Sequence, residues 1–232
     1  MKLEIVCHCW QYSRLLTYQL SSLVLYAPRE VDVLATVFCA EEDQNTVEVV
    51  RYFSTIEKPG NVRIRPWYLP RDQIMLRLIG RNLAALATEA DWVWFADCDY
   101  LFRDGALDGL RQCVGQTESP LVFPRLVQTN CCHELGDRAI AQASAGPGVL
   151  DILPGDFCPQ KFRRAIGGIQ IARGEVVRRV GYCKDSRRQE WRCPHWVKPS
   201  DDIHFRRSLG TAGTPVEIPN VFRVRHSTRG VN

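Results

Sequence analysis

The chain has 232 residues, 45% of them hydrophobic and 24% charged, a composition typical of a globular protein with a sizeable core. Lys and Arg outnumber Asp and Glu by 30 to 26, and the net charge of +4 is too small to indicate a nucleic-acid partner. No apolar run approaches the length that spans a membrane, so we expect no transmembrane segment.

Strands and helices are predicted to alternate through the first hundred residues. Short apolar segments predict strands over 3–7, 31–38, 62–69 and 90–96. Segments with apolar residues at helical spacing lie between them and predict helices over 13–26, 44–53 and 74–87. This alternation predicts an α/β fold with a mostly parallel central sheet and helices on both faces.

The pattern weakens after residue 100. Gly, Pro and Cys are frequent over 128–162, which predicts a long irregular loop that closes over a substrate. The remaining short elements are predicted as helices over 104–113, 175–180 and 201–209, and as strands over 121–126, 166–172 and 221–225.

The cysteines and the amino terminus suggest a compartment. The first residues carry an acid inside their apolar stretch and no small-residue cleavage site, so we expect no signal peptide. Ten cysteines without an export signal are typical of reduced thiols in a cytoplasmic protein, and we predict no structural disulfide. Arg pairs at 163–164, 178–179, 187–188 and 206–207 are compatible with phosphate or peripheral membrane binding, but we favour solvated helix faces.

The triplet Asp97-Cys98-Asp99 follows the fourth predicted strand and is the most informative motif. Ligands in open α/β sheets bind beyond the carboxyl ends of the strands. In extended backbone Asp97 and Asp99 point to the same side, where one can hold a polar substrate group and the other a hard cation. Asp-x-Asp also occurs in solvated turns, so the wider context decides.

The order of several motifs resembles glycosyltransferases of the GT-A fold, especially family 2. These motifs are Gly80-Arg81-Asn82, the acidic triplet, Gly167-Gly168, Gly181-Tyr182 and Asp201-Asp202-Ile203-His204-Phe205. The ending Arg225-His226-Ser227 is similar to the carboxyl-terminal half of β-galactosyltransferases. The resemblance implies a single GT-A domain over 1–232, with a nucleotide-sugar-binding half at 1–100 and an acceptor-binding half at 101–232.

The resemblance also implies a metal-dependent inverting transferase that moves a hexose from a nucleotide sugar, usually a UDP-sugar, to a hydroxyl of a saccharide-type acceptor. A metal and cationic side chains stabilise the charge that the leaving diphosphate gathers. Asp99 and His226 are the metal ligands that the resemblance implies, for Mn²⁺ or Mg²⁺. The resembled galactosyltransferases have Met three residues before this His, whereas this chain has Arg223, so the metal sphere is thinner or a cation replaces part of it.

The same resemblance assigns donor-binding residues. Asp97 would hold the ribose or the sugar, and Arg81 would lie near the nucleotide, with a solvated helix Arg as the equal alternative. The nucleobase contact falls on Glu41, Glu42 or Asp43 after the second strand, where the usual Asp-Asp is missing. Gly167 and Gly168 would let backbone approach the sugar, or would simply form a tight turn.

Inversion requires a carboxylate that takes the proton of the acceptor hydroxyl. The resemblance places this base at Asp202, with Asp201 contacting the acceptor, although the register of the pair stays open and Asp156 is the next choice. The alternative is an N-capping pair at the start of a helix. Trp196 would stack on the acceptor sugar or fill the core.

Three other functions are weighed against this one. A nucleotidyltransferase needs a Gly-rich loop after the first strand, where this chain has Cys7-His8-Cys9-Trp10-Gln11. An aspartate-nucleophile phosphatase carries its Asp-x-Asp after the first strand rather than the fourth. A non-catalytic nucleotide-sugar or carbohydrate binding protein of the same fold remains the main alternative.

Overall fold

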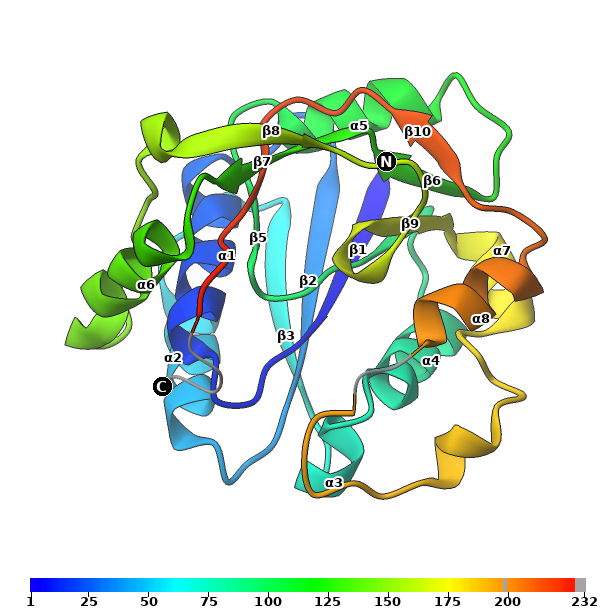
Figure 1. Ribbon diagram of the computed structural model, residues 1–232, viewed down its shortest axis with the longest axis horizontal. Coiled ribbons are helices and arrows are strands. Elements are labelled where there is room, and N and C mark those ends of the chain that lie inside the picture. The colour runs from blue at the N-terminus through cyan, green and yellow to red at the C-terminus, as the bar shows by residue number, and fades with distance from the viewer. Residues whose placement is uncertain (198–199, 228–232) are drawn as a thin grey trace.

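The computed structural model describes residues 1–197 and 200–227 (Figure 1). Within these residues the centre of the molecule is a seven-stranded sheet with the order β10-β6-β9-β4-β1-β2-β3. Its strands are β1 (Lys2–His8), β2 (Asp32–Cys39), β3 (Val62–Tyr68), β4 (Trp92–Phe95), β6 (Leu121–Pro124), β9 (Gln170–Arg173) and β10 (Thr214–Val216). Only β9 runs antiparallel to its neighbours, β4 and β6. The sheet is therefore mixed but mostly parallel.

A second, four-stranded sheet has the order β5-β11-β7-β8. Its strands are β5 (Tyr100–Phe102), β7 (Leu126–Asn130), β8 (Phe157–Lys161) and β11 (Val221–Arg223). The predicted strand over 121–126 is in fact split between the two sheets, because the chain leaves the central sheet at Arg125. The carboxyl-terminal strand β11 pairs with β5, which directly follows the acidic triplet.

Helices cover both faces of the central sheet, as predicted. Helices α1 (Ser13–Leu25) and α2 (Gln44–Thr55) pack together on one side, and α4 (Arg77–Ala87) packs with α7 (Gly174–Val180) on the other (Figure 1). The remaining helices are α3 (Arg71–Ile74), α5 (Ala106–Val114), α6 (His133–Gln142), α8 (Asp201–Ser208) and the short 3₁₀ turns η1 (Ala143–Ala145), η2 (Pro154–Asp156), η3 (Gly167–Ile169) and η4 (Arg187–Glu190).

The core explains why the first hundred residues were predictable. Strand β4 is buried along its whole length, and Ile5 and Val6 of β1 are almost fully buried beside it. Burial of each such side chain contributes about 1.5–3 kcal/mol. The continuous apolar run that predicted a covered parallel strand is thus the centre of the sheet.

The segment 128–162 is not the long irregular loop that we predicted. It contains the end of β7, helix α6 and strand β8, which pairs antiparallel with β7. The Gly146-Pro147-Gly148 turn lies against α1, where Ser21 Oγ accepts a hydrogen bond from the amide of Leu150 at 2.9 Å. Gly and Pro lie in the turns between these elements, and their frequency led us to predict a loop where short elements are present.

The prediction of no structural disulfide is wrong. Cys131 and Cys158 form a disulfide with their Cα atoms 5.8 Å apart. Pairing of β7 with β8 sets Thr129 opposite Cys158 and so brings the two cysteines together. Because β8 was not predicted, sequence spacing gave no sign of this pair. A disulfide is more typical of oxidising compartments, so cysteine usage no longer supports a cytoplasmic location.

Replacing Cys131 and Cys158 by Ser should lower the free energy of unfolding by about 2–4 kcal/mol, because the cross-link restricts the unfolded chain. Urea unfolding followed by circular dichroism measures the difference. Cys132→Ser is the matched control, since Cys132 is an exposed free thiol next to the disulfide. An unchanged unfolding midpoint in the double variant would contradict a stabilising role.

None of the helices in the described part of the chain is both long and apolar enough to cross a bilayer.

Candidate functional site

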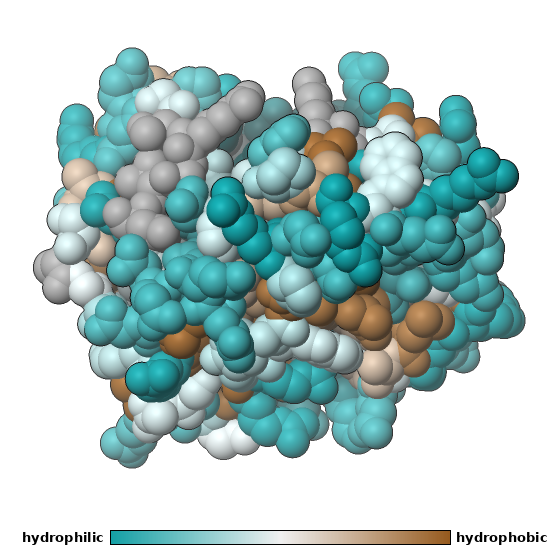
Figure 2. All heavy atoms as spheres, turned by 90° about the horizontal axis from the view of Figure 1, so that it is seen from below, coloured by the Kyte–Doolittle hydropathy of each residue, from teal (hydrophilic) through white to brown (hydrophobic). Residues whose placement is uncertain are grey.

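The parallel strands β1 and β4 end at the lower side of the molecule in Figure 1, and the acidic triplet lies at the end of β4. Figure 2 views the molecule from this side. The visible surface is mainly hydrophilic, with a band of hydrophobic residues across its middle. The carboxyl ends of the strands therefore open onto a face of mixed polarity, as ligand sites of open α/β sheets do.

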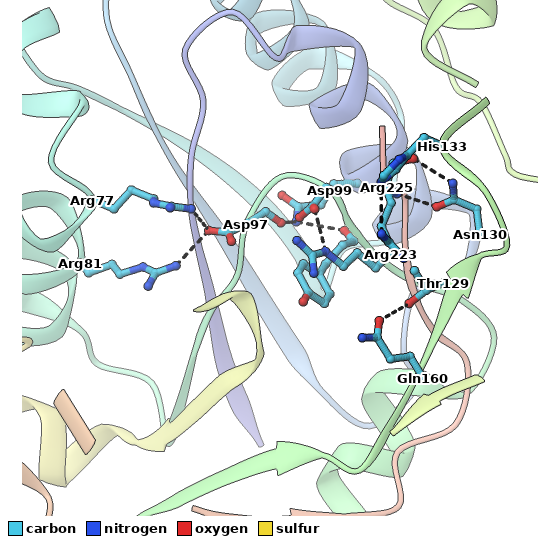
Figure 3. A network of polar contacts seen from close by, with 12 residues as sticks. Arg77, Arg81, Asp97, Asp99, Thr129, Asn130, His133, Gln160, Arg223 and Arg225 are labelled. Carbon is cyan, nitrogen blue, oxygen red and sulfur yellow. Dashed lines mark hydrogen bonds and ion pairs between the residues drawn. The ribbon is translucent and has the colours of Figure 1, made fainter. Parts of the chain in front are cut away.

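Asp97 is held between two arginines of α4 (Figure 3). Its Oδ1 accepts hydrogen bonds from Arg77 at 2.7 Å and from Arg81 at 3.1 Å. Burial raises the pKa of the Asp97 carboxyl, but Arg77 and then Arg81 lower it by more, and the pKa falls to about 2. Asp97 is therefore ionised at neutral pH and fixes two guanidinium groups at the end of β4.

Arg81 is a buried site residue and not a solvated helix Arg. Its side chain is 4% exposed, and its Nη1 donates to the hydroxyl of Tyr182 at 3.0 Å. The Tyr182 hydroxyl in turn donates to Gln170 Oε1 at 2.7 Å. Arg77, which our sequence interpretation missed, lies one helical turn before Arg81; the i, i+4 spacing on α4 was the signal that could have found it.

Asp99 is paired with Arg223 of β11 (Figure 3). Arg223 Nε donates to Asp99 Oδ2 at 2.9 Å, and the charge of Asp99 raises the pKa of the Arg223 guanidinium despite its burial. The other carboxylate oxygen, Oδ1, is buried and has no hydrogen-bond partner among the residues described. The position where the resembled galactosyltransferases have Met thus supplies a cation that contacts the expected metal ligand.

His226 lies three residues after the end of β11. The amide of Val224, two residues before His226, donates to the backbone carbonyl of Asp99 at 2.9 Å. The His226 ring meets the edge of Tyr12, which follows β1, with ring centroids 5.5 Å apart. The described residues contain no group of three or more His, Cys, Asp and Glu side chains that could hold a metal.

Gly167 and Gly168 lie directly beside the triplet. A Cβ atom on Gly168 would come within 2.8 Å of the Asp97 amide nitrogen and 2.6 Å of the Tyr100 ring. Gly167 has a φ of +43°, and a Cβ there would lie 3.9 Å from Asp97 Oδ2. The glycine pair is therefore required for close approach of η3 to Asp97, and it keeps the side of this carboxylate open.

The two acids of α8 bind arginines instead of capping the helix. Asp201 is 5% exposed and forms an ion pair with Arg188 of η4. Burial raises the pKa of the Asp201 carboxyl, and its Oδ2 has no partner within the described residues. Asp202 is more exposed, and its Oδ2 accepts from Arg206 Nη1 at 3.1 Å. The N-capping alternative therefore does not account for either side chain.

Trp196 lies beside an arginine that pairs with the acidic triplet. The Arg77 guanidinium lies 5.7 Å from the centroid of the half-buried Trp196 ring. The indole Nε1 is buried and lacks a hydrogen-bond partner in the described part of the chain. Because Arg77 also binds Asp97, this ring lies next to the triplet, and it also packs against the hydrophobic core.

The acidic segment after β2 divides into two kinds of residue. Glu41 and Glu42 are exposed. Asp43 is buried and caps α2: it accepts hydrogen bonds from Thr46 Oγ1 at 2.7 Å and from the amide of Gln11 at 2.6 Å. The Asp43 carboxylate is therefore used to hold the start of α2, and Glu41 and Glu42 are the exposed acids that a ligand could reach after β2.

His8 is a buried histidine that our sequence interpretation passed over. It ends β1, stacks on Phe38 with ring centroids 4.9 Å apart, and its two ring nitrogens have no partner among the residues described. Gly80 packs so closely that a Cβ there would lie 2.3 Å from Nε2. Burial, and then the charge of Arg81, lower the pKa of His8 well below 6.5. The ring is therefore neutral in the folded protein.

Stability should fall as the pH drops below about 6.5, because the unfolded chain takes up a proton at His8 and the folded chain does not. Urea unfolding between pH 7.5 and pH 5 measures this slope, and His8→Leu should flatten it. An equal slope in His8→Leu and the parent protein would show that other groups cause the pH dependence.

No protein-family model matches the chain, and no curated protein matches it in sequence. Its fold is similar to that of solved structures. Residues 1–349 of TarS from S. aureus, in complex with UDP-GlcNAc, match with a TM-score of 0.62 at 12% identity over 99% of this chain and 60% of that one. The mannosyltransferase PcManGT from Pyrobaculum calidifontis, in complex with GDP-Man and Mn²⁺, matches with a TM-score of 0.54 at 14% identity over 96% and 56%.

These matches confirm the fold class. The chain has the mostly parallel α/β fold of GT-A glycosyltransferases and spans about 60% of the first matched structures. At 12–14% identity the likeness shows the fold alone and gives no family assignment. The resemblance of the carboxyl-terminal half to β-galactosyltransferases stays a prediction.

Proposed function

We propose that this chain is a metal-dependent inverting glycosyltransferase that moves a hexose from a nucleotide sugar to a hydroxyl of a saccharide-type acceptor. The observation that carries the proposal is that acidic and arginine side chains gather at the carboxyl end of β4. Asp97 and Asp99 lie there with three arginine side chains, and Asp97 is linked through Arg77 to Trp196. Asp201 lies within electrostatic reach of both Arg77 and Arg81.

The donor would lie over the triplet, within the half formed by residues 1–100. Asp97 would accept hydrogen bonds from ribose or sugar hydroxyls, on the side that Gly167 and Gly168 keep open. Arg77 and Arg81 would face the diphosphate, whose charge grows as the glycosidic bond breaks. Glu41 and Glu42 are the candidates for the nucleobase. A UDP-sugar is the first donor to test, with a GDP-sugar beside it, because the matched structures hold UDP-GlcNAc and GDP-Man.

Asp99 and His226 would hold the cation, Mn²⁺ or Mg²⁺. The buried, unpartnered Oδ1 of Asp99 fits this role, because a carboxylate oxygen without a donor is a suitable ligand for a hard cation. Phosphate oxygens of the donor would complete the sphere that the protein leaves open. When bound, the ion would neutralise charge on the leaving diphosphate. Arg223, on the opposite oxygen of Asp99, would add a fixed positive charge on the same side.

The acceptor would lie in the half formed by residues 101–232, between Trp196 and the start of α8. Asp202 would take the proton of the acceptor hydroxyl, because its carboxylate is the more accessible of the pair. Asp201 would orient the acceptor through its unpartnered Oδ2. Trp196 would offer a ring face for the sugar and an indole N–H for a hydroxyl.

The test is a panel of UDP- and GDP-sugars incubated with the protein, Mn²⁺ and mixed saccharide acceptors. Release of the nucleoside diphosphate, with a coupled enzyme assay, reports transfer or donor hydrolysis. Metal-dependent release with at least one donor supports the proposal. Tight nucleotide-sugar binding without any release, under all conditions, would instead show the non-catalytic binding protein that shares this fold.

A further inference from the structure

Three of the four Arg pairs in the sequence meet around α8, although they are dispersed along the chain. Arg187 and Arg188 form η4, and Arg188 joins it to the start of α8 through Asp201. Arg163 and Arg164 precede Ala165, whose carbonyl accepts a hydrogen bond from Arg206 of α8. Figure 1 shows α8 between the segment before η3 and the segment that contains η4.

This part of the chain has a large positive net charge. Residues 161–207 contain 13 Lys and Arg against 5 Asp and Glu, a net charge of +8, whereas the whole chain carries +4. The rest of the protein is therefore net negative. The small overall charge conceals a strongly basic segment, and the two acids of α8 belong to it.

Several of these arginines form no ion pair within the described part of the folded protein. Arg163, Arg164, Arg187 and Arg207 are exposed, and none forms an ion pair with a carboxylate within residues 1–197 and 200–227. The fourth pair shows the contrast. Arg178 is used within the fold, because it donates to the backbone carbonyls of Thr88 and Ala90. Unpaired guanidinium groups of one sign repel each other, so a surface that gathers them fits an anionic ligand.

A buried hydrogen-bond donor near α8 also fits an anionic ligand. Arg188 uses Nη1 for Asp201, while its Nη2 is buried and has no partner in the described part of the chain. The Arg188 guanidinium also lies 5.5 Å from the centroid of Trp191, a ring that is 50% exposed. A guanidinium supported by an aromatic face, with a free N–H, is suited to carboxylate or phosphate oxygens.

We propose that the acceptor is an anionic saccharide or polyol, bearing phosphate or carboxylate groups, and that Arg163, Arg164, Arg187 and Arg207 bind those groups beside Asp202. Calling this ligand the acceptor rests on the proposed function, but the inference that the surface binds anions does not. The basic surface lies on one side of the catalytic pair, so charged groups would bind next to the hydroxyl that reacts. Neutral saccharides would lack these contacts.

The experiment measures binding of three probes to the full chain. UDP and Mn²⁺ are present in excess, so that they occupy the donor site and the anionic probes do not bind there. The probes are trigalacturonate, tripolyphosphate and neutral maltotriose. Both anions should bind, with an affinity that falls as salt rises, and maltotriose should not. Arg163→Gln/Arg164→Gln and Arg187→Gln/Arg207→Gln should each weaken anion binding by about tenfold. The control Arg29→Gln/Arg63→Gln removes the same charge from exposed positions elsewhere and should change it less than about twofold.

Each result decides the proposal. Equal weakening in the control would mean that overall charge, not this surface, attracts the anions, and equal binding of maltotriose would also overturn the proposal. Vesicles of phosphatidylcholine with one-quarter phosphatidylglycerol form a further arm. Binding to these vesicles without binding to the soluble anions would make the surface a membrane contact instead. Because UDP binding is measured separately, loss of the donor site and loss of the anion surface are distinguishable.

Discussion

Asp202→Asn is expected to lower the rate of sugar transfer by about 10²–10⁴ while donor binding changes little. The amide keeps the size of the side chain and can still accept the hydrogen bond from Arg206. It cannot take a proton from the acceptor hydroxyl. Single-turnover transfer measures the chemical step, and equilibrium titration with the nucleotide measures donor binding.

Asp201→Asn is the internal control for this prediction. Asp201 is buried against Arg188, so the change weakens an ion pair and should lower acceptor affinity and thermal stability as well. Asp202→Asn should not lower stability, because its partner Arg206 also binds the carbonyl of Ala165. Normal turnover in Asp202→Asn with complete loss in Asp201→Asn would assign the base to Asp201. Normal turnover in both would place the base elsewhere, and the half-buried Asp156 of η2 would be tested next.

The fold of the first hundred residues was predictable because its four strands are separated by helices and pair in parallel with one another, β1 with β2 and β4, and β2 with β3. Strands 3–7, 31–38, 62–69 and 90–96 correspond to β1, β2, β3 and β4, which lie side by side in the sheet. Burial on both faces produces the continuous apolar run of β4, whereas the edge strand β3 is only partly buried and carries arginines between its apolar residues. Only the helix over 74–87 differs, because the chain breaks at Met75 and Leu76 into α3 and α4.

The second half was less predictable because its pairings join distant segments. Strand β9 inserts between β4 and β6, and β10 pairs with β6 across 90 residues of chain. Strands β5, β10 and β11 each have three residues, too short for a period-two pattern to be read. The disulfide depends on one such pairing and was therefore missed together with β8.

The candidate site was predictable where the chemistry lies in short motifs. Asp97, Asp99, Arg81 and the glycine pair do lie together, as the order of motifs suggested. Contacts that long-range packing creates were not predictable. The gathering of the Arg pairs around α8 is one such case, since we had favoured solvated helix faces for them. The role of Arg77 is another, because only the turn of α4 places it on Asp97.

Asp99→Asn is expected to abolish metal-dependent nucleotide binding and to reduce transfer to the background level, because the carboxylate is the proposed protein ligand with a free buried oxygen. The amide oxygen can still accept from Arg223 Nε, so the contact between the triplet turn and β11 should survive. Asp99→Ala removes that contact too and should add a loss of melting temperature. Calorimetric titration with UDP, with and without Mn²⁺, separates the two effects. Asp104→Ala, an exposed acid just after β5, is the matched control and should behave like the parent protein.

Arg223→Met is a second test of the metal site. It removes the guanidinium that pairs with Asp99 and introduces the residue that the resembled galactosyltransferases have at this position. The affinity for Mn²⁺ should rise by about tenfold, because a positive charge 2.9 Å from Asp99 Oδ2 opposes a second cation on the same carboxylate. His226→Ala should lower the same affinity more modestly, since phosphate and water oxygens can take the place of one imidazole. The contrary result is equally clear. If Arg223→Met abolishes nucleotide binding and Mn²⁺ has no effect on the parent protein, then Arg223 itself neutralises the diphosphate, and Asp99 serves to position that guanidinium instead of holding a metal.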